Sequence, residues 1–329
     1  MSAHVSLHRR KFMLSAAMLA ASAAVPSRAE TYPVKPVRFV VPSAVGSGTD
    51  ILARILGNRL GEVWQQQVVV DNRVGVGGVL GSDYVAKAPP DGYTLCMGFS
   101  GPISISPALL KSIPYNPLKD FAAVTLVDSS PNVLVVNPSL PAKSVKQLIE
   151  LARARPGFLT FGSAGYGTMG HMCGETFEAL SQTKMLHVPY KAVSQALTDV
   201  VGGEIKVLFH VAAAVMSLVK AGKLRALGVT SLKRWSILPD LPSIAEAGLP
   251  GYDVTVWHGV LVPAGTPHLL IDKLYRDMSD AMKTDEVRKQ FATQWTEPLG
   301  TTPDSFASFL KADVERSASV VKGAGLHVE

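Results

Sequence analysis

The chain has 329 residues, of which 47% are hydrophobic and 18% are charged, with 32 Lys and Arg against 26 Asp and Glu. Its only two cysteines, Cys96 and Cys173, exclude a disulfide-rich scaffold and a zinc site; we expect two buried thiols, while a bridge between them stays open. A chain of this length exceeds what one compact core usually takes, so we expect two lobes.

The first 29 residues have the pattern of an export signal. The basic triplet Arg9-Arg10-Lys11 precedes an apolar run over 12–25, which is followed by the small-x-small sequence Ser27-Arg28-Ala29. The run is shorter than the roughly 20 residues that span a bilayer, which argues against a membrane anchor. We therefore expect residues 1–29 to be cleaved on export to the periplasm, by a signal that also approaches the twin-arginine pattern.

The basic charge of the chain depends on that leader. Residues 1–29 hold four Lys or Arg and no acidic residue, so 28 basic residues face 26 acidic ones in the remainder. This near balance, without a stripe of Lys and Arg interleaved with exposed aromatics, argues against a nucleic-acid partner.

Strand-like and helical patterns alternate along nearly the whole chain. This alternation predicts an α/β fold with mostly parallel sheets. The patterns cover residues 37–41, 51–64, 68–71, 79–88, 94–98, 133–136, 145–154, 159–163, 169–180, 186–188, 194–201, 207–210, 215–221, 224–230, 269–284 and 303–321. Turn-rich segments at 129–132 and 247–252 predict where the chain crosses between lobes, with 30–131 and 251–329 in the first lobe and 132–250 in the second.

The segment from Pro42 to Asp50 joins an apolar strand to an amphipathic helix through a glycine loop. Such a loop aims unpaired backbone N–H groups and the positive end of the helix dipole at a ligand, so it favours an anion. The loop lacks the Gly-Lys-Ser/Thr ending of a phosphate loop, which argues against nucleotide hydrolysis.

A related strand, glycine loop and helix occur at 158–171, where Gly165–Gly170 matches the pattern G-x-G-x-x-G. A dinucleotide fold would also need an acidic residue at the end of the next strand, and that strand ends in Val188-Pro-Tyr-Lys191 without one. We therefore expect no dinucleotide cofactor. Two anion-receiving helix ends instead suggest a cleft for a small molecule that bears a carboxylate.

Signs of catalysis or of a metal site are weak. The chain has no G-x-S-x-G elbow, and no pair among His171, His187, His210 and His258 has metal-ligand spacing. A hydrogen-bonded structural role is therefore the better expectation for any one of these histidines. We assign no catalytic residue, no metal ligand and no cofactor.

Several segments together resemble a known family. They include Tyr32-Pro-Val-Lys-Pro-Val-Arg38, Pro42-x-x-x-Gly-Ser-Gly-Thr-Asp50, Val70-Asp-Asn-Arg73, Val85-Ala-Lys-Ala-Pro-Pro-Asp-Gly-Tyr-Thr-Leu95, Phe161-Gly-Ser-Ala-Gly165, His187-Val-Pro-Tyr-Lys191, Gly222-Lys-Leu-Arg-Ala-Leu227 and Leu238-Pro-Asp-Leu-Pro-Ser243. In this order they resemble the extracytoplasmic solute-binding proteins of tripartite tricarboxylate transporters, the Bug family.

The resemblance implies a two-lobe clamshell like that of periplasmic binding proteins, which closes on a small organic acid. It implies that loops 42–50 and 163–168 grip one carboxylate, that the protein is not an enzyme, and that it delivers its cargo to membrane permease subunits. A monomer is the default for a clamshell that must open.

The chain departs from the family pattern at two histidines. His210 stands where the family commonly has an acid, and His258 where it commonly has a phenyl ring. If both face the cleft, the imidazoles favour a second anionic group, so we expect a dicarboxylate or an aromatic carboxylate. The candidate ligand-binding residues are Pro42, Ser43, Gly46, Ser47, Gly48, Thr49, Asp50, Ser100, Ser163, Ala164, Gly165, Gly167, Thr168, Tyr190, His210 and His258.

Two other functions stay open on the sequence. A ligand sensor that reports to a membrane kinase would need the same clamshell as a transport receptor. An exported α/β oxidoreductase would use the Gly165–Gly170 loop for its cofactor, and the missing ribose-binding acid argues against it.

Overall fold

The computed structural model describes residues 32–323 and 325, and the export signal predicted over residues 1–29 lies outside them. From Lys35 onward the described chain forms one compact unit. Within the described part of the chain, every helix is too short or too polar to cross a membrane.

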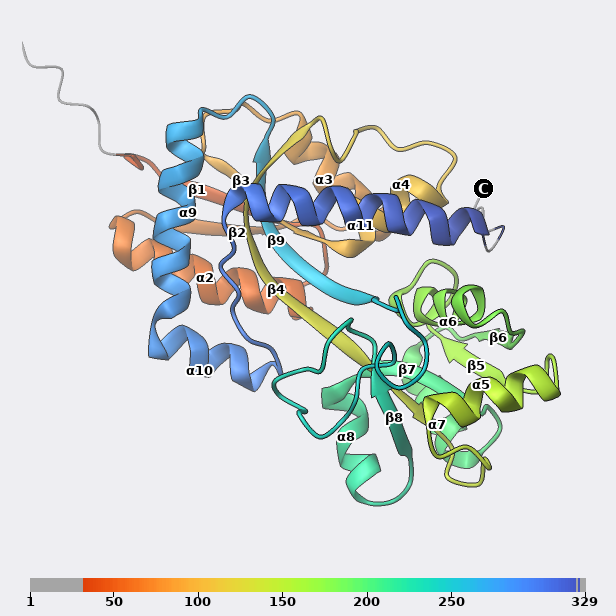
Figure 1. The fold of residues 1–329 in the computed structure, drawn as a ribbon. Coiled ribbons are helices and arrows are strands. Elements are labelled where there is room, and N and C mark those ends of the chain that lie inside the picture. Colours follow the sequence, from red (N-terminus) through yellow and green to blue (C-terminus); the bar gives the residue numbers. More distant parts are fainter. Residues whose placement is uncertain (1–31, 324, 326–329) are drawn as a thin grey trace, which may run out of the picture. The chain divides into compact units, whose positions relative to one another are not determined.

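One sheet of nine strands runs through this unit (Figure 1). Its strands follow the order β2-β1-β3-β9-β4-β7-β5-β6, and β8 also pairs with β4. The strands are β1 (Val37–Val41), β2 (Val68–Asn72), β3 (Thr94–Phe99), β4 (Phe121–Val136), β5 (Thr160–Ser163), β6 (Leu186–Pro189), β7 (Val207–Val211), β8 (Arg225–Val229) and β9 (Thr255–Pro263).

The sheet is mixed, with parallel pairs at its two ends and antiparallel pairs in the middle. β1 is parallel to β2 and β3, and β5 is parallel to β6 and β7. β9 is antiparallel to β3 and β4, and β4 is antiparallel to β7 and β8. The α/β class predicted from the sequence is confirmed, but parallel pairing is confined to the strands that crossover helices connect.

The two long central strands, β4 and β9, join the two lobes (Figure 1). Residues 129–132 were expected to form a turn, and this expectation is wrong, because they continue strand β4. Ser129 pairs with Trp257 and Pro131 with Thr255, after which Asn132 pairs with Val211 of β7. Pro131 thus stands where one partner strand ends and another begins.

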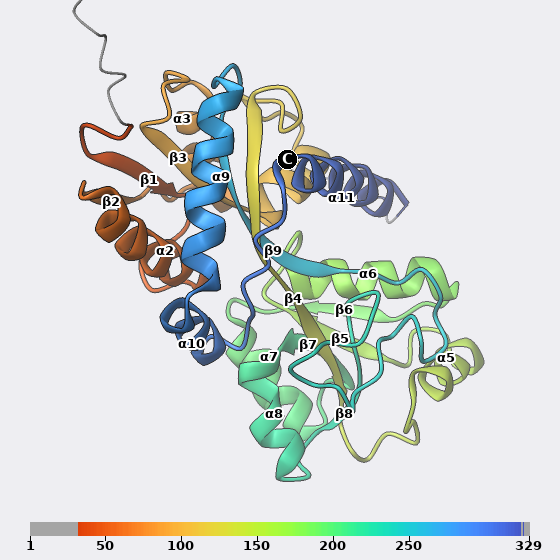
Figure 2. The ribbon, with the colours of Figure 1, turned by 60° about the vertical axis from the view of Figure 1, so that its left-hand side comes forward.

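Helices cover both faces of the sheet (Figure 2). The first lobe contains β1–β3 with α2 (Gly48–Trp64), η1 (Val76–Gly78), α3 (Val79–Ala86), η2 (Gly101–Ile105), α4 (Ser106–Leu109), α9 (His268–Lys283), α10 (Asp285–Thr293) and α11 (Pro303–Gly323). The second contains β5–β8 with α5 (Val145–Ala154), α6 (Met169–Ser181), α7 (Val193–Gly202) and α8 (Ala212–Lys220). Most of these helices fall within a few residues of the ranges predicted from hydrophobic periodicity.

The inner strand β7 of the second lobe is buried on both faces over residues 207–209. In β7, Leu208 packs with the cluster that α7 and α8 cover, while Phe209 packs with the cluster that α5 and α6 cover. Successive side chains of a strand point to opposite faces, so a strand covered on both sides reads as a continuous apolar run. The run 207–209 therefore has no polar alternation.

Both cysteines are free and fully buried. Cys96 lies in the core of the first lobe and Cys173 in that of the second. Burial raises the pKa of the Cys173 thiol to about 12 and raises that of Cys96 as well. The expectation of two buried thiols is confirmed.

Replacing Gly174 by Ala tests how tightly α6 packs on the sheet. A Cβ there would clash with Cε2 of the buried Phe161 ring, so we expect the free energy of unfolding to fall by about 1–3 kcal/mol. Gly202, in the last turn of α7, has open space around a Cβ, so Gly202→Ala should raise the free energy of unfolding by about 0.4–1 kcal/mol. Urea unfolding measures both, and equal stabilities would contradict this packing.

Candidate functional site

A cavity of about 380 Å³ lies between the two lobes, beside the crossing strands β4 and β9. Its volume is in the range of sites for small organic ligands. The first lobe and the crossing strands contribute Gly48, Thr49, Leu52, Asp128, Ser130, Pro131, Val256, His258, Gln294, Trp295 and Thr296; the second contributes Val211, Ala212, Ala213 and Trp235. The described lining contains no Lys or Arg.

The N-terminus of α2 opens on this cavity. Ser47 caps the helix, because its hydroxyl accepts a hydrogen bond from the Asp50 backbone N–H at 3.2 Å. The Ser43 hydroxyl lies 2.7 Å from that of Ser47 and supports the cap. The first helical residues, Gly48 and Thr49, line the cavity, and their backbone N–H groups precede the first intrahelical bonds.

Asp50 braces the loop before α2. Its buried carboxylate accepts hydrogen bonds from the Gly46 backbone N–H at 2.8 Å, from Arg54 at 3.0 Å and from Asn72 at 2.9 Å. Burial by itself raises the pKa of Asp50, but the hydrogen bonds from Arg54, Gly46 and Asn72 outweigh it and hold the pKa below its ordinary value. This carboxylate fixes the shape of the loop and leaves the N–H groups of Gly48 and Thr49 for a ligand.

A polar network forms one wall of the cavity around Asp128. The Asp128 carboxylate lies 2.7 Å from Nδ1 of His258, 2.7 Å from the Thr296 hydroxyl and 3.1 Å from the Ser130 hydroxyl. Asp128 and Thr296 are buried, and so is His258. Among the described residues, Nε2 of His258 has no hydrogen-bond partner, so one imidazole nitrogen is left to a ligand.

A β-bulge turns Asp128 toward the cavity. Leu126 pairs with Gly259 but Asp128 pairs with His258, so β4 has one residue more than β9 over this step. The extra residue moves Asp128 to the opposite face from Leu126, whose side chain lies in the apolar core of the first lobe. Trp257 points into that same core, and its neighbour His258 therefore faces the cavity.

Two tryptophans from different lobes belong to the apolar part of the wall. Trp235 follows β8 and Trp295 follows α10, and both are partly buried against the same apolar cluster. Trp295 has a φ of 54°, in the left-handed region that bulky residues rarely adopt. Strained residues of this kind tend to occur at ligand clamps, which agrees with the place of Trp295 in the cavity wall.

The N-terminus of α8 opens on the cavity from the second lobe. Val211 precedes the helix and offers no side-chain cap, and its own N–H donates to Nδ1 of His210 at 2.9 Å. Burial lowers the pKa of His210, so its neutral form is favoured. His210 thus lies next to Val211 at the cavity, but it is not among the described lining residues.

The second glycine loop, 163–168, is held by the buried His171 and the partly buried His187. The Ser163 hydroxyl lies 2.7 Å from Nε2 of His187 and accepts from the Gly165 N–H at 3.0 Å. The Gly167 N–H donates to Nδ1 of His171 at 3.1 Å. The centroids of the two imidazole rings are 4.3 Å apart. Burial, together with the nearby His171, lowers the pKa of His187 to about 4.

This histidine pair has the hydrogen-bonded structural role that the sequence favoured. Ser163 and His171 accept from the N–H groups of Gly165 and Gly167, which loop 163–168 was expected to present to a ligand. The described lining of the 380 Å³ cavity does not include this loop; Gly167 instead packs near Leu109 of α4.

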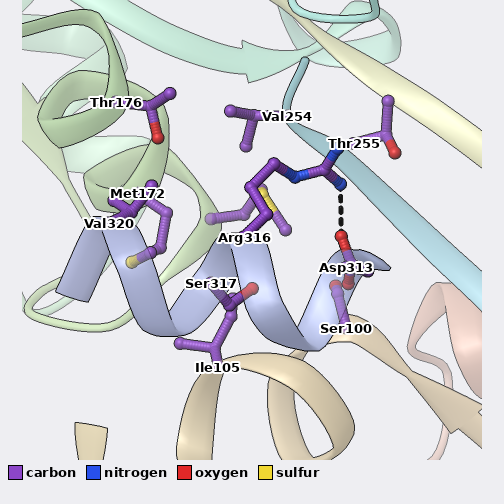
Figure 3. Close-up of a pocket in the computed structure, with 11 residues that line it drawn as sticks. Ser100, Ile105, Met172, Thr176, Val254, Thr255, Asp313, Arg316, Ser317 and Val320 are labelled. Carbon is purple, nitrogen blue, oxygen red and sulfur yellow. Dashed lines mark hydrogen bonds and ion pairs between the residues drawn. The ribbon is translucent and has the colours of Figure 1, made fainter. Parts of the chain in front are cut away.

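The remaining candidates lie in different places. Ser100 lines a second, water-sized cavity of about 30 Å³ between η2, α6 and α11, where Arg316 pairs with Asp313 (Figure 3). The Tyr190 hydroxyl donates to Asp199 at 2.7 Å, and burial, with Asp199, raises the pKa of Tyr190 to about 12. Pro42 packs against Gly78 and Gly81, and Gly46 has a φ of 80°, in the left-handed region. The Thr168 hydroxyl donates to the Gly165 carbonyl, and Ala164 is exposed on the surface.

Of the sixteen candidates, the cavity lining includes Gly48, Thr49 and His258. Sequence reasoning missed Asp128, the two tryptophans and the start of α8. Asp128 did carry a signal, because an acid at the end of the apolar run 124–127 is unusual in a buried strand. Nothing local distinguishes Trp235 or Trp295 from core residues.

The described residues include no group of three or more His, Cys, Asp and Glu placed to hold a metal ion. The cavity instead offers backbone N–H groups at helix ends, hydroxyls and one imidazole. The N–H groups and hydroxyls suit an organic anion.

Asp50→Asn tests the brace of the first loop. We expect the free energy of unfolding at about pH 7 to fall by about 1–3 kcal/mol, because a charged acceptor of several buried hydrogen bonds is lost. The lowered pKa of Asp50 means that its stabilisation is complete above the unfolded value of about 3.9 and is lost as the pH falls through the folded value. The difference in unfolding free energy between wild type and Asp50→Asn should therefore narrow below about pH 4.

Urea unfolding across this pH range measures the gap. Glu62→Gln removes an exposed ion pair with Arg59 on the same helix, and this control should change stability by less than about 0.5 kcal/mol. A gap for Asp50→Asn that stays constant with pH would contradict the role given to this carboxylate.

Comparisons with known proteins identify the family of this chain. The model of the tripartite tricarboxylate transporter family receptor matches residues 52–326. Protein BugT of Bordetella pertussis is 36% identical over 306 residues, which cover 93% of this chain and 94% of BugT. Its similarity spans both lobes.

Two solved structures are similar over most of the chain. Rpa4515 of R. palustris with adipate is 36% identical with a TM-score of 0.74, over 90% of this chain and 100% of its own. MatC (Rpa3494) from Rhodopseudomonas palustris with bound malate is 29% identical with a TM-score of 0.70, over 88% of this chain and 100% of its own. The chain therefore belongs to the tripartite tricarboxylate transporter receptor family and has the two-lobe α/β fold of its Bug-type periplasmic binding proteins.

Proposed function

We propose that this protein is a periplasmic receptor that captures a small carboxylate between its two lobes and delivers it to a tripartite tricarboxylate-type membrane transporter. The observation that carries this proposal is the cavity between the lobes, onto which the N-terminus of α2 opens with the N–H groups of Gly48 and Thr49. Family membership supports the receptor role, and the related Rpa4515 and MatC structures contain adipate and malate.

The chemistry of the cavity favours a carboxylate held by hydrogen bonds and a helix dipole. With no Lys or Arg in the described lining, a phosphate or polyanion would lack a full countercharge. A helix N-terminus acts as roughly half a positive charge, which suits one carboxylate. His258 and the two tryptophans support the narrower proposal of a dicarboxylate or an aromatic carboxylate.

Ligand capture in this proposal is coupled to movement of the lobes. We assign residues 30–131 and 251–329 to one lobe and 132–250 to the other, and β4 and β9 are the connections about which they close. Loop 163–168 and His210, which lie outside the described lining, are proposed to approach the ligand on closure. The protein is proposed to act as a monomer after cleavage of residues 1–29.

Thr49→Val tests the site, because valine keeps the shape of threonine and loses its hydroxyl. Thr49 is 5% exposed, and in the described part of the chain its hydroxyl has no hydrogen-bond partner. We expect the variant to bind a carboxylate about tenfold more weakly while its unfolding free energy is unchanged. A thermal-shift screen of dicarboxylates, aromatic acids and amino acids on the wild-type protein identifies the ligand to use in this binding measurement. A ligand at about 100 times its Kd adds about 2.7 kcal/mol to the free energy of unfolding, which raises the melting temperature.

Thr266→Val is the matched control. Thr266 is equally buried, but its hydroxyl donates to the Pro263 carbonyl at 2.8 Å, far from the cavity lining. This variant should lose about 1 kcal/mol of stability and keep its affinity. If no carboxylate in the screen stabilises the wild-type protein, the proposed function is wrong.

A further inference from the structure

We propose that the N-terminus of α8 is a second carboxylate site, which faces the N-terminus of α2 across the cavity, so that the ligand is a dicarboxylate with one carboxylate on each lobe. This inference rests on the proposed function and narrows it. Its anchor in the second lobe is formed by Ala212 and Ala213, neither of which the sequence motifs indicated.

The first turn of α8 leaves its N–H groups open. Val211, which precedes the helix, makes no side-chain cap, and the first turn holds no acidic residue. Ala212, Ala213 and Ala214 follow, and a methyl side chain is too short to cover the backbone or to bond with it. The first N–H groups of a helix have no intrahelical acceptor, so these are available to an anion in the cavity.

Thr49 and His258 point independently to a ligand in the same cavity. Thr49 as a residue is 5% exposed, lines the cavity and, among the described residues, has no hydrogen-bond partner for its hydroxyl. His258 is 8% exposed, and its Nδ1 is engaged by Asp128 while Nε2 has no partner in that part of the chain. A ligand carboxylate can accept from the Thr49 hydroxyl. With Nδ1–H of His258 donating to Asp128, the neutral ring leaves Nε2 as an acceptor for a ligand hydroxyl.

The two helix ends come from different lobes. α2 follows β1 in the first lobe and α8 follows β7 in the second, so each lies at the carboxyl end of its strand. Ligands of open α/β sheets bind at these strand ends. A ligand that bonds to Thr49 and to Ala213 at the same time would therefore link the lobes through its own length.

The charges in the cavity favour a diacid over an amino acid. An ammonium group would need a free acceptor, yet the carboxylate of Asp128, the acid of the described lining, already has His258, Ser130 and Thr296 around it. The positive end of the α8 dipole would also repel an ammonium group. A monocarboxylate would leave one helix end without an anion.

Ala213→Asp places a carboxylate in the first turn of α8. Aspartate is favourable at that position of a helix, so the melting temperature should stay the same or rise. The new carboxylate should occupy the proposed anion site and lower the affinity for the preferred dicarboxylate at least about tenfold. The affinity for the monocarboxylate with the same number of carbons should change by less than about threefold.

The measurement is isothermal titration calorimetry of the purified protein with succinate, adipate and suberate, each against butyrate, hexanoate or octanoate. Ser194→Asp is the matched control: Ser194 is the second residue of α7, whose N-terminus also lacks a side-chain cap, and it is exposed away from the cavity lining. Asparagine has the size of aspartate without its charge, so Ala213→Asn should lower the dicarboxylate affinity less than Ala213→Asp does. Ser194→Asp should leave every affinity unchanged.

The outcomes separate this inference from the proposed function. If wild-type protein binds carboxylates but prefers no diacid to its monoacid, or if Ala213→Asp keeps the preference, the second site is wrong and the receptor function stands. If neither series binds to the wild-type protein, the proposed function is overturned and this inference with it. A diacid preference that Ala213→Asp abolishes and Ser194→Asp retains supports both.

Discussion

The antiparallel pairing of β4 with β9 is the constraint on which the rest of the structure depends. These two strands belong to both lobes, so their hydrogen-bond ladder decides how the lobes are connected. Their register also sets the polar wall of the cavity, because the bulge that brings Asp128 opposite His258 turns both toward it. A slip of one residue would direct these side chains into the apolar core instead.

The cavity combines rigid parts with polar atoms left free for a ligand. On the first lobe, Asp50 and Ser47 satisfy much of the loop before α2 and leave Gly48 and Thr49 open. Asp128 is arranged in a similar way. Its carboxylate bonds to Thr296 and holds Nδ1 of His258, while Nε2 of His258 has no hydrogen-bond partner among the described residues. Polar groups that are held by their neighbours lose little freedom when a ligand arrives, which favours affinity.

The two glycine loops, alike in sequence, differ in how their N–H groups are used. In the first loop a carboxylate, Asp50, takes one N–H group and the helix start remains free. In the second, Ser163 and His171 accept from Gly165 and Gly167, and the His187 ring lies within hydrogen-bond distance of the Ser163 hydroxyl. Similar glycine loops therefore produce different donor sets, because the neighbouring side chains that accept from their N–H groups differ: Asp50 in the first loop, Ser163 and His171 in the second.

The sequence alone determined most helices and strands, the buried cysteines, the capped start of α2 and, through its motifs, the family. These depend on hydrophobic periodicity, capping and loop chemistry within short segments. Only the tertiary structure decided that residues 129–132 form a strand, that the middle of the sheet is antiparallel, and that Asp128, Trp235, Trp295 and the start of α8 meet in one cavity. The physical reason is that strand pairing and cavity walls join residues far apart in the chain, so local propensity cannot encode them.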